Sequence, residues 1–357
     1  MSAQRTSLFD RHQALKAKIV DFAGWDMPVQ YTSVKEEVLA VRKDVGVFDV
    51  SHMGEFFAEG PDAIAFVDHL VTNDIQNAPL LKAVYSPLCR DNGTVIDDLI
   101  VYKLAPQRVL ICVNASNIDK DFKWMSSKTA GFNVRFTNRS ADYSLLALQG
   151  PRSAAVLKGL IPAIPDMEYY SVWEGEWNGR PVIVARTGYT GEDGFEVFGD
   201  HRTVGQLWEA FMAANVAPCG LAARDVLRLE VCYPLYGHEL NDETSPYDAG
   251  LAWTVKGEKV RFIGKEALAA KPSRYKLVKL LVEKGIPREG YSVCDADGVV
   301  IGHVTSGTLS VVLNQGVALA RIEKAKATPE QKYFIDIRQK KYAATPTTKA
   351  FVQGGHK

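Results

Sequence analysis

The sequence predicts an α+β fold that ends in a separate all-β domain. Helix-like and strand-like patterns alternate up to about residue 270, whereas the segment from Tyr275 onward consists of short β-prone runs separated by turn-forming residues. The chain has 357 residues, more than one hydrophobic core usually serves, and 46% of them are hydrophobic. We therefore expect several domains, each with its own core.

Apolar periodicity and β-branched runs locate the expected elements. The first helix should be capped by Thr32 or Ser33, and Asn178-Gly179 between two apolar runs predicts a two-residue hairpin. The predicted helices span residues 33–44, 63–70, 117–125, 153–160, 205–214 and 220–230. The predicted strands span 84–88, 95–104, 109–114, 144–148, 174–177, 182–185 and 195–198, and in the C-terminal domain 277–282, 299–304, 311–313, 317–322 and 333–337.

Composition excludes several classes of protein. Lys and Arg number 42, as do Asp and Glu, so the chain lacks the positive field that nucleic-acid binding requires. The five cysteines are scattered singly, which argues against a disulfide framework or a zinc site and favours a reducing compartment. No stretch is apolar for long enough to cross a membrane. We expect a cytoplasmic protein, or a mitochondrial matrix protein if a transit segment has been removed.

The run Arg186–Glu196 sets an arginine, a tyrosine and acidic residues around three glycines, as in a ligand-binding loop. It is not a phosphate-binding loop, because no Lys follows the last glycine and Glu192 and Asp193 would repel an anion. Taken alone, such a loop is more often an acidic hairpin tip with no ligand.

Asp97 and Asp98 interrupt an otherwise apolar predicted strand. Alternation places them on opposite faces, with Asp98 on the face of Tyr102, so the two acids do not share one site. A carboxylate in a buried strand needs a structural or catalytic purpose. Asp98 is the one expected to face a pocket, although both acids could instead bind backbone amides at a bend.

Arg224 and Arg228 stand four residues apart on one face of a predicted helix. They form either a structural ion-pair cluster or a clamp for a ligand. With Glu196, a forked guanidinium matches the donor and acceptor edge of a pterin or purine-like ring, on which Tyr189 or Tyr85 could stack.

Two further features favour structural interpretations. His52 has no second ligand at metal spacing, so a hydrogen-bonded structural histidine is expected rather than a catalytic one. Eight basic residues between Lys256 and Lys279 form a local positive stretch. They favour a solvated linker surface over a docking site for an acidic protein.

Taken together, six stretches closely resemble the T-protein of the glycine cleavage system, an aminomethyltransferase that uses tetrahydrofolate. They are Val20–Pro28, Val47–Met53, Val95–Leu99, Leu148–Pro151, Arg186–Glu196 and Gly220–Glu230. The resemblance runs in order from about Leu8 to the C-terminal domain, and it departs from the family pattern at Thr94 and Ala222, where glycine is usual.

The resemblance implies a cloverleaf of three domains around a central folate channel, with a C-terminal β-barrel. The first domain would comprise residues 1–51 and 140–246, the second 52–139, a linker 247–274 and the barrel 275–357. It also implies roles for single residues. Asp98 matches the catalytic carboxylate, Glu196 and Arg224 match the pterin-binding acid and arginine, and the other positions of the folate pocket are Tyr85, Tyr102, Asn114, Tyr189 and Met53.

The implied reaction starts from an aminomethyl group on the lipoyl arm of the carrier H-protein and yields ammonia and 5,10-methylenetetrahydrofolate. Two alternatives share the fold. One is a folate-dependent demethylase of small sulfonium or N-methyl substrates. The other is a folate-binding iron–sulfur assembly factor, but its Lys-Gly-Cys-Tyr-x-Gly-Gln-Glu element has no match around Cys232-Tyr233.

Overall fold

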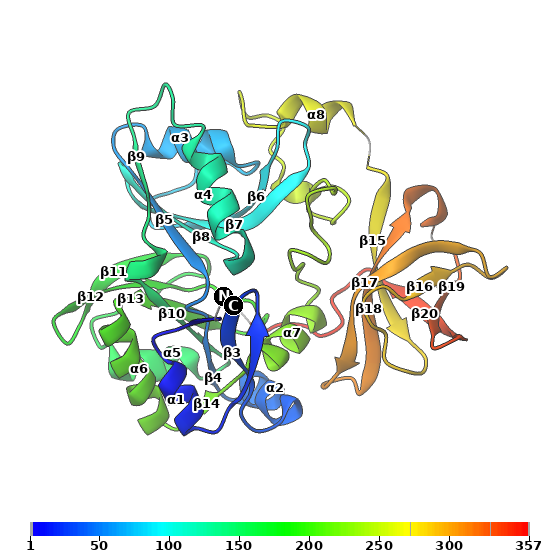
Figure 1. Cartoon of the computed structure of the whole chain (residues 1–357), viewed down its shortest axis with the longest axis horizontal. Coiled ribbons are helices and arrows are strands. Elements are labelled where there is room, and N and C mark those ends of the chain that lie inside the picture. The colour runs from blue at the N-terminus through cyan, green and yellow to red at the C-terminus, as the bar shows by residue number, and fades with distance from the viewer. Residues whose placement is uncertain (1–2, 272, 329, 356–357) are drawn as a thin grey trace. The chain divides into compact units, whose positions relative to one another are not determined.

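A computed structural model describes residues 3–271, 273–328 and 330–355 (Figure 1). The chain has the α+β architecture that the sequence predicts, and it separates into two compact units. The first unit consists of Met1–Ser86, Leu99–Arg224 and Gly354–Lys357, and the second consists of Pro87–Asp98 and Asp225–Gln353. No helix among the described residues is both long and apolar enough to span a membrane.

A six-stranded sheet in the first unit carries the ligand-loop candidate. Its strand order is β11 (Val172–Trp177), β12 (Arg180–Ala185), β13 (Gly194–Gly199), β10 (Ser144–Gln149), β4 (Gly46–Asp49) and β14 (Ala217–Pro218). The accompanying helices are α2 (Val34–Lys43), α5 (Ser153–Leu160), α6 (His201–Ala213) and α7 (Leu221–Glu230), the last of which continues into the second unit. Leu146, Val197 and Trp208 belong to one buried core, which fixes α6 against the strands.

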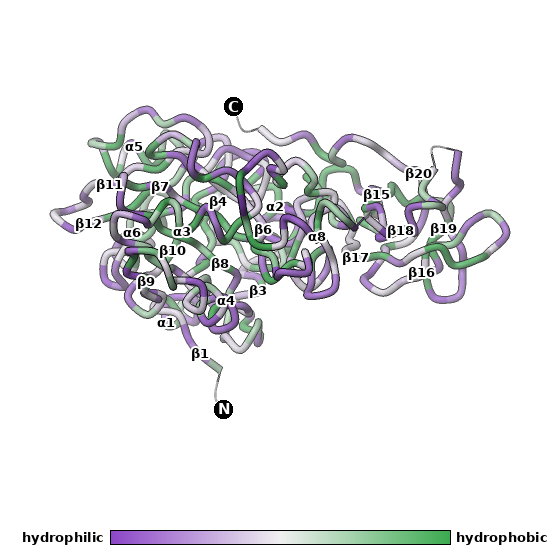
Figure 2. Tube along the Cα trace, turned by 90° about the horizontal axis from the view of Figure 1, so that it is seen from above, coloured by the Kyte–Doolittle hydropathy of each residue, from purple (hydrophilic) through white to green (hydrophobic). Residues whose placement is uncertain are grey.

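A five-stranded sheet has the order β6 (Ala83–Cys89), β7 (Val95–Ala105), β8 (Arg108–Val113), β5 (Gly54–Glu59) and β9 (Arg135–Asn138). Helices α3 (Ala63–Leu70) and α4 (Ile118–Ser126) belong to the same α+β layer. Phe66 and Phe122 from these helices both contact Phe136, with ring centroids 5.4 and 5.3 Å apart. Hydrophobic segments follow β7 and β8 in Figure 2. The helices therefore cover one face of the sheet.

The N-terminal segment adds a small sheet that sequence patterns did not predict. It contains β1 (Gln4–Arg5), β3 (Trp25–Gln30) and β2 (Lys18–Phe22), next to helix α1 (Phe9–Ala14). His12 Nε2 and Asp49 Oδ2 are 2.8 Å apart and fully buried, and Tyr31 OH lies 2.8 Å from His12 Nδ1. This buried polar chain ties the N-terminus to β4.

In the second unit, six strands close into the barrel that the sequence predicts. Their order is β15 (Tyr275–Val282), β18 (Gln315–Glu323), β17 (Val300–Ser310), β16 (Ser292–Cys294), β19 (Tyr333–Ile337) and β20 (Lys340–Thr347). Helix α8 (Lys265–Ala270) precedes them. The predicted strand at 311–313 is wrong, because these residues form the turn between β17 and β18.

Local capping and turn residues predicted the bounds of several elements correctly. Ser33 caps α2 by accepting a hydrogen bond from the Glu36 amide. Asn178 and Gly179 both have positive φ, 50° and 71°, as a tight hairpin turn requires. Helix α6 begins four residues before the predicted start, because Asp200 accepts from the Thr203 amide and so caps an earlier first turn.

Glu55 is a buried acid in the five-stranded sheet. It lies opposite Cys112 on β8, and Cys112 lies opposite Ile100 on β7, so Glu55 faces away from the helix-covered side. Neither carboxyl oxygen has a hydrogen-bond partner among the described residues. Burial raises the pKa of Glu55 well above its ordinary value of 4.5. The protonated form is therefore favoured in the folded chain.

Because the folded-state pKa of Glu55 is raised, its stability contribution is present below pH 4.5 and lost as pH rises toward that folded-state pKa. We expect Glu55→Gln to weaken the decline in stability above pH 4.5. Glu55→Met, which removes the unpartnered polar atoms, should raise the free energy of unfolding at neutral pH by about 1–3 kcal/mol. Urea unfolding between pH 4.5 and 8 measures both effects. An unchanged pH slope in Glu55→Gln would contradict this assignment.

Candidate functional site

The loop between β12 and β13 is held by its own acidic residues. Arg42 Nη1 donates to Glu192 Oε1 at 2.8 Å and to the Thr190 carbonyl at 2.7 Å. Arg186 forms a two-pronged pair with Asp193, with both N–O distances 2.8 Å. The sequence suggested that these two acids would repel an anion. In the structure arginines of the same chain pair with both carboxylates, and the acids order the loop.

Close packing explains two of the loop glycines. A Cβ at Gly188 would lie 2.0 Å from Gln149 Oε1, and one at Gly194 would lie 2.3 Å from Gln149 Nε2. The Gln149 amide also donates to the Thr187 carbonyl at 3.1 Å and accepts from Thr190 Oγ1 at 2.8 Å. Among the loop glycines only Gly191 has positive φ, so close approach is the main requirement.

Glu196 presents a fixed carboxylate at the start of β13. Thr187 Oγ1 and Tyr102 OH donate to Oε2 at 2.5 and 3.2 Å, whereas Oε1 has no hydrogen-bond partner among the described residues. Its neighbours across the strands are the small residues Ala147 and Ala185. One oxygen is thus anchored, and the other can accept hydrogen bonds from a ligand.

Tyr102 helps to fix the Glu196 carboxylate by donating a hydrogen bond to it. Its ring is fully buried and meets Phe198 edge-on, with centroids 5.5 Å apart. Burial, followed by the nearby Glu196 charge, raises the pKa of Tyr102 well above 10. The phenol therefore remains a hydrogen-bond donor to Glu196.

Arg224 and Arg228 have separate roles. The guanidinium of Arg224 lies 4.5 Å from the centre of the Tyr189 ring and has no hydrogen bond or ion pair among the described residues. Arg228 is fully buried and bonds to Asp225, Glu239 and Ser306, with distances of 2.8, 3.1 and 2.9 Å. Arg228 is therefore the structural ion-pair residue, and Arg224 keeps its donors available.

His52 is buried but does not behave as the hydrogen-bonded histidine that was expected. Its Nδ1 has no hydrogen-bond partner among the described residues, and Phe22 packs edge-on against its ring at 5.6 Å. Burial, and then the positive charge of Arg224, lowers the pKa of His52 to about 4. The imidazole is therefore neutral near pH 7.

The two acids of β7 differ in exposure. Asp97 is fully buried, whereas Asp98 is partly exposed and shares a strand face with Ile100 and Tyr102. Asn114 directly follows the end of β8 with extended backbone, and it continues the alternation of Cys112, the partner of Ile100. The sheet face opposite the helices therefore carries Tyr102 and Asn114.

The remaining predicted pocket residues, Met53 and Tyr85, are partly buried. Met53 precedes β5, and its amide donates to the Val50 carbonyl at 3.0 Å. Tyr85 lies on β6, where its carbonyl accepts from Asn73 Nδ2 at 2.9 Å. The contacts described for these two residues involve their backbones and leave their roles toward a ligand as predictions.

Three supports of the site escaped the sequence analysis. Neither Gln149 nor Arg42 was singled out from the sequence; they lie within the stretch Leu148–Pro151 and the predicted helix 33–44. Gly355 near the C-terminus lies so close to the loop that a Cβ there would be 2.4 Å from Glu192 Oε2. These contacts join residues far apart in sequence and have no local signal. Glu55 could have been noticed, because it is an acid within the apolar alternation of a strand.

The chain is similar to glycine cleavage T-proteins over nearly its whole length. Residues 8–259 match the family model described as the GCVT N-terminal domain, and residues 276–353 match the glycine cleavage T-protein C-terminal barrel domain. An aminomethyltransferase of Thermotoga sp. (strain RQ2) is 47% identical over 92% of each chain. One of Thermosipho melanesiensis is 44% identical over 99% of this chain and 98% of its own.

A solved structure agrees with these sequence matches. The glycine cleavage system aminomethyltransferase T from Bartonella henselae superposes with a TM-score of 0.93, covers 99% of each chain and is 32% identical.

We expect Gln149→Leu to lower the free energy of unfolding by about 2–4 kcal/mol, because the substitution leaves buried polar groups of Thr187 and Thr190 without their partner. Gln206→Leu is the matched control, since Gln206 is exposed on α6. Urea unfolding measures both variants. Equal stability of the two variants would show that the Gln149 contacts contribute little.

Proposed function

The chain belongs to the glycine cleavage T-protein family of aminomethyltransferases, and we propose that its acceptor is tetrahydrofolate, held by Glu196 and Arg224. The observation that supports this proposal is the presence of two available polar groups in the first unit. The Oε1 atom of Glu196 and the guanidinium of Arg224 are both without hydrogen-bond partners among the described residues. An unpartnered acceptor and an unpartnered forked donor are what a pterin edge requires.

The pterin ring offers complementary groups. Its amino group and adjacent ring N–H would donate to Glu196, and its carbonyl would accept from Arg224. Thr187 and Tyr102 hold the Glu196 carboxylate in place, so little side-chain entropy is lost on binding. The Tyr189 ring orients the guanidinium in the same way.

We assign the chemical step to Asp98. In the proposed reaction, one folate nitrogen attacks the aminomethyl carbon and displaces ammonia. The carbon–sulfur bond to the lipoyl arm then breaks and releases the thiol, and the second folate nitrogen bonds to the carbon, which carries positive charge while these bonds break. A carboxylate directed at this carbon stabilises the developing charge, as a preorganised oxyanion hole does for a negative one. Asp98 suits this role better than Asp97, which is fully buried.

We expect the positioning of the two reactants to supply much of the remaining rate acceleration. Holding two reactants at attack distance contributes roughly 7–11 kcal/mol in favourable cases. The aminomethyl group would arrive on the lipoyl arm of a carrier, the H-protein, and the enzyme would return the reduced arm. Membership of the family supports this partner.

We expect Asp98→Asn to retain folate affinity and to lower the rate of methylenetetrahydrofolate formation by roughly a hundredfold or more, because the amide carries no charge to stabilise the cationic carbon. Folate titration measures the affinity. A carrier-dependent assay with ammonia release as the readout measures the rate. Wild-type turnover by the variant would remove Asp98 from the mechanism. Turnover of small methyl donors instead of the carrier would favour a demethylase.

Glu196→Ala and Arg224→Ala should each weaken folate binding by roughly 5- to 150-fold, since losing one partner of a buried hydrogen bond costs about 1–3 kcal/mol. Isothermal calorimetry with tetrahydrofolate measures the change. Glu176→Ala is the matched control, because Glu176 is an exposed acid of the same sheet. Equal affinity of all three variants would refute the assigned pterin contacts.

A further inference from the structure

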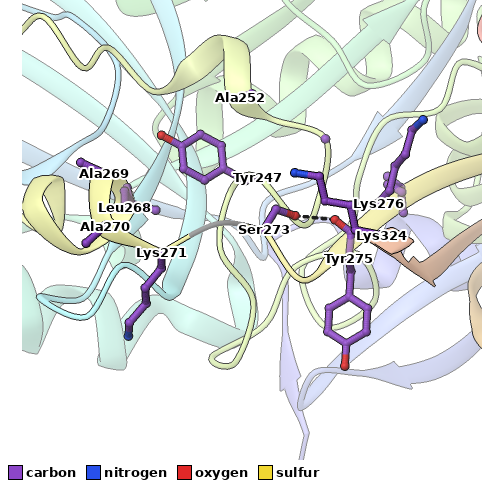
Figure 3. A pocket seen from close by; sticks show the side chains of 12 residues that line it. Tyr247, Ala252, Leu268, Ala269, Ala270, Lys271, Ser273, Tyr275, Lys276 and Lys324 are labelled. Carbon is purple, nitrogen blue, oxygen red and sulfur yellow. Dashed lines mark hydrogen bonds between the residues drawn. The ribbon is translucent and has the colours of Figure 1, made fainter. Parts of the chain in front are cut away.

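His52 is a buried side chain whose hydrogen-bonding capacity the fold leaves unused. It is 1% exposed, and its Nδ1 atom has no hydrogen-bond partner among the described residues. Buried polar atoms of folded proteins nearly always have a partner, because an unpaired one is costly. Figure 3 shows the usual case in the second unit, where the Ser273 hydroxyl donates to the Tyr275 carbonyl. The unpaired Nδ1 of His52 is therefore a candidate contact for a ligand.

The surroundings of His52 hold its imidazole in place. His52 lies in the turn Val50–Met53 between β4 and β5, and the Met53 amide closes this turn by donating to the Val50 carbonyl at 3.0 Å. Phe22 packs edge-on against the imidazole, with ring centroids 5.6 Å apart. Because the ring is already fixed, little side-chain entropy is lost when a ligand binds it.

The sheet topology brings His52 to the same edge as Arg224. Strands β4 and β14 are parallel neighbours, and Pro218 lies opposite Val47. The residues that follow two parallel neighbours lie at the same edge of the sheet. After β4 the chain enters the turn Val50–Met53, and after β14 it enters α7, whose first turn contains Arg224. Both side chains therefore come from one edge of the six-stranded sheet in the first unit.

The electrostatic surroundings of His52 agree with this placement. Burial, and then the positive charge of Arg224, lowers the pKa of His52 to about 4, while the Asp49 charge acts in the opposite direction. Asp49 is already bound to His12, with Nε2 and Oδ2 2.8 Å apart. The imidazole of His52 is therefore neutral near pH 7, and it acts as a hydrogen-bonding group rather than as a base that stores a proton.

A reduced pterin offers a matching group at this position. In the proposed function, on which this inference rests, Glu196 binds the amino group and the adjacent ring N–H, and Arg224 binds the carbonyl. The next polar group along the ring, on the far side of the carbonyl, is the N5–H of a tetrahydropterin. A neutral imidazole nitrogen beside Arg224 can accept a hydrogen bond from that N–H.

We propose that Nδ1 of His52 accepts a hydrogen bond from N5–H of the bound tetrahydropterin and so orients one of the two nitrogens that receive the one-carbon unit. His52 is then a positioning and specificity residue, because it favours a pterin that is reduced at N5. The imidazole makes and breaks no covalent bond in this role. The ligand supplies the partner that Nδ1 lacks within the described part of the chain.

The test compares two ligands by calorimetry, tetrahydrofolate and 5-deazatetrahydrofolate, in which a CH2 group replaces N5–H. We expect His52→Leu to weaken tetrahydrofolate binding by roughly 5- to 150-fold, because N5–H then loses its acceptor. The variant should bind the deaza analogue no more weakly than the unaltered chain does, since that ligand has no N–H to satisfy. An equal loss for both ligands, or no loss for tetrahydrofolate, would overturn the proposal.

Two further variants separate this contact from a structural effect. His52→Asn places an oxygen acceptor where Nδ1 stands, so it should bind tetrahydrofolate more tightly than His52→Leu. His201→Leu is the matched control, because both ring nitrogens of His201 have partners within the fold, Ser144 Oγ at 2.8 Å and the Ala141 carbonyl at 2.9 Å. It should leave the ratio of the two affinities unchanged. A changed ratio in His201→Leu would show that the ratio reports on folding rather than on contact.

Nitrogen-15 spectra of the unaltered chain, labelled at histidine, give the same test if His52→Leu fails to fold. The Nδ1 signal of His52, assigned by its absence from His52→Asn, should shift more with tetrahydrofolate than with the deaza analogue. Equal shifts would overturn the contact with N5–H. Absence of tetrahydrofolate binding by the unaltered chain would instead refute the proposed function.

Discussion

The side-chain amide of Gln149 makes the contacts on which the loop between β12 and β13 depends. It lies where Gly188 and Gly194 leave no room for side chains, and it bonds to Thr187 and Thr190. Thr187 in turn holds the Glu196 carboxylate. A single buried amide thus links the strand β10, through Thr187, to Glu196.

Some charged side chains of the site form ion pairs that hold the loop in place, whereas others keep hydrogen-bonding atoms without a partner among the described residues. Glu192 and Asp193 are paired with arginines, whereas Glu196 has one oxygen without a partner among the described residues. The same division applies to the arginines of α7. Arg228 is enclosed by hydrogen bonds, whereas the guanidinium of Arg224 lies over the Tyr189 ring and has no hydrogen bond or ion pair among the described residues. Residue type alone does not distinguish these roles, because they depend on which partners the fold brings near.

Local signals predicted much of the fold, and they failed where long-range packing decides. Asn178-Gly179 and Ser33 specify a turn and a cap through their own backbone preferences. The apolar run at 311–313 has strand-like composition, yet the chain reverses there, and Val312 and Leu313 are 45% and 39% exposed. At the site, sequence singled out the loop, Glu196 and Arg224. It could not identify Arg42 or Gln149, whose partners lie some 40 or more residues away.

The tight fit of Gly355 against Glu192 bears on how the protein can be handled. An affinity tag fused to the C-terminus would extend the chain directly from the segment that packs on Glu192, and it would strain that segment's fit beside the ion pair of Glu192 with Arg42. A tag placed ahead of Gln4 avoids this contact. Purified material intended for folate titration is therefore better tagged at the N-terminus.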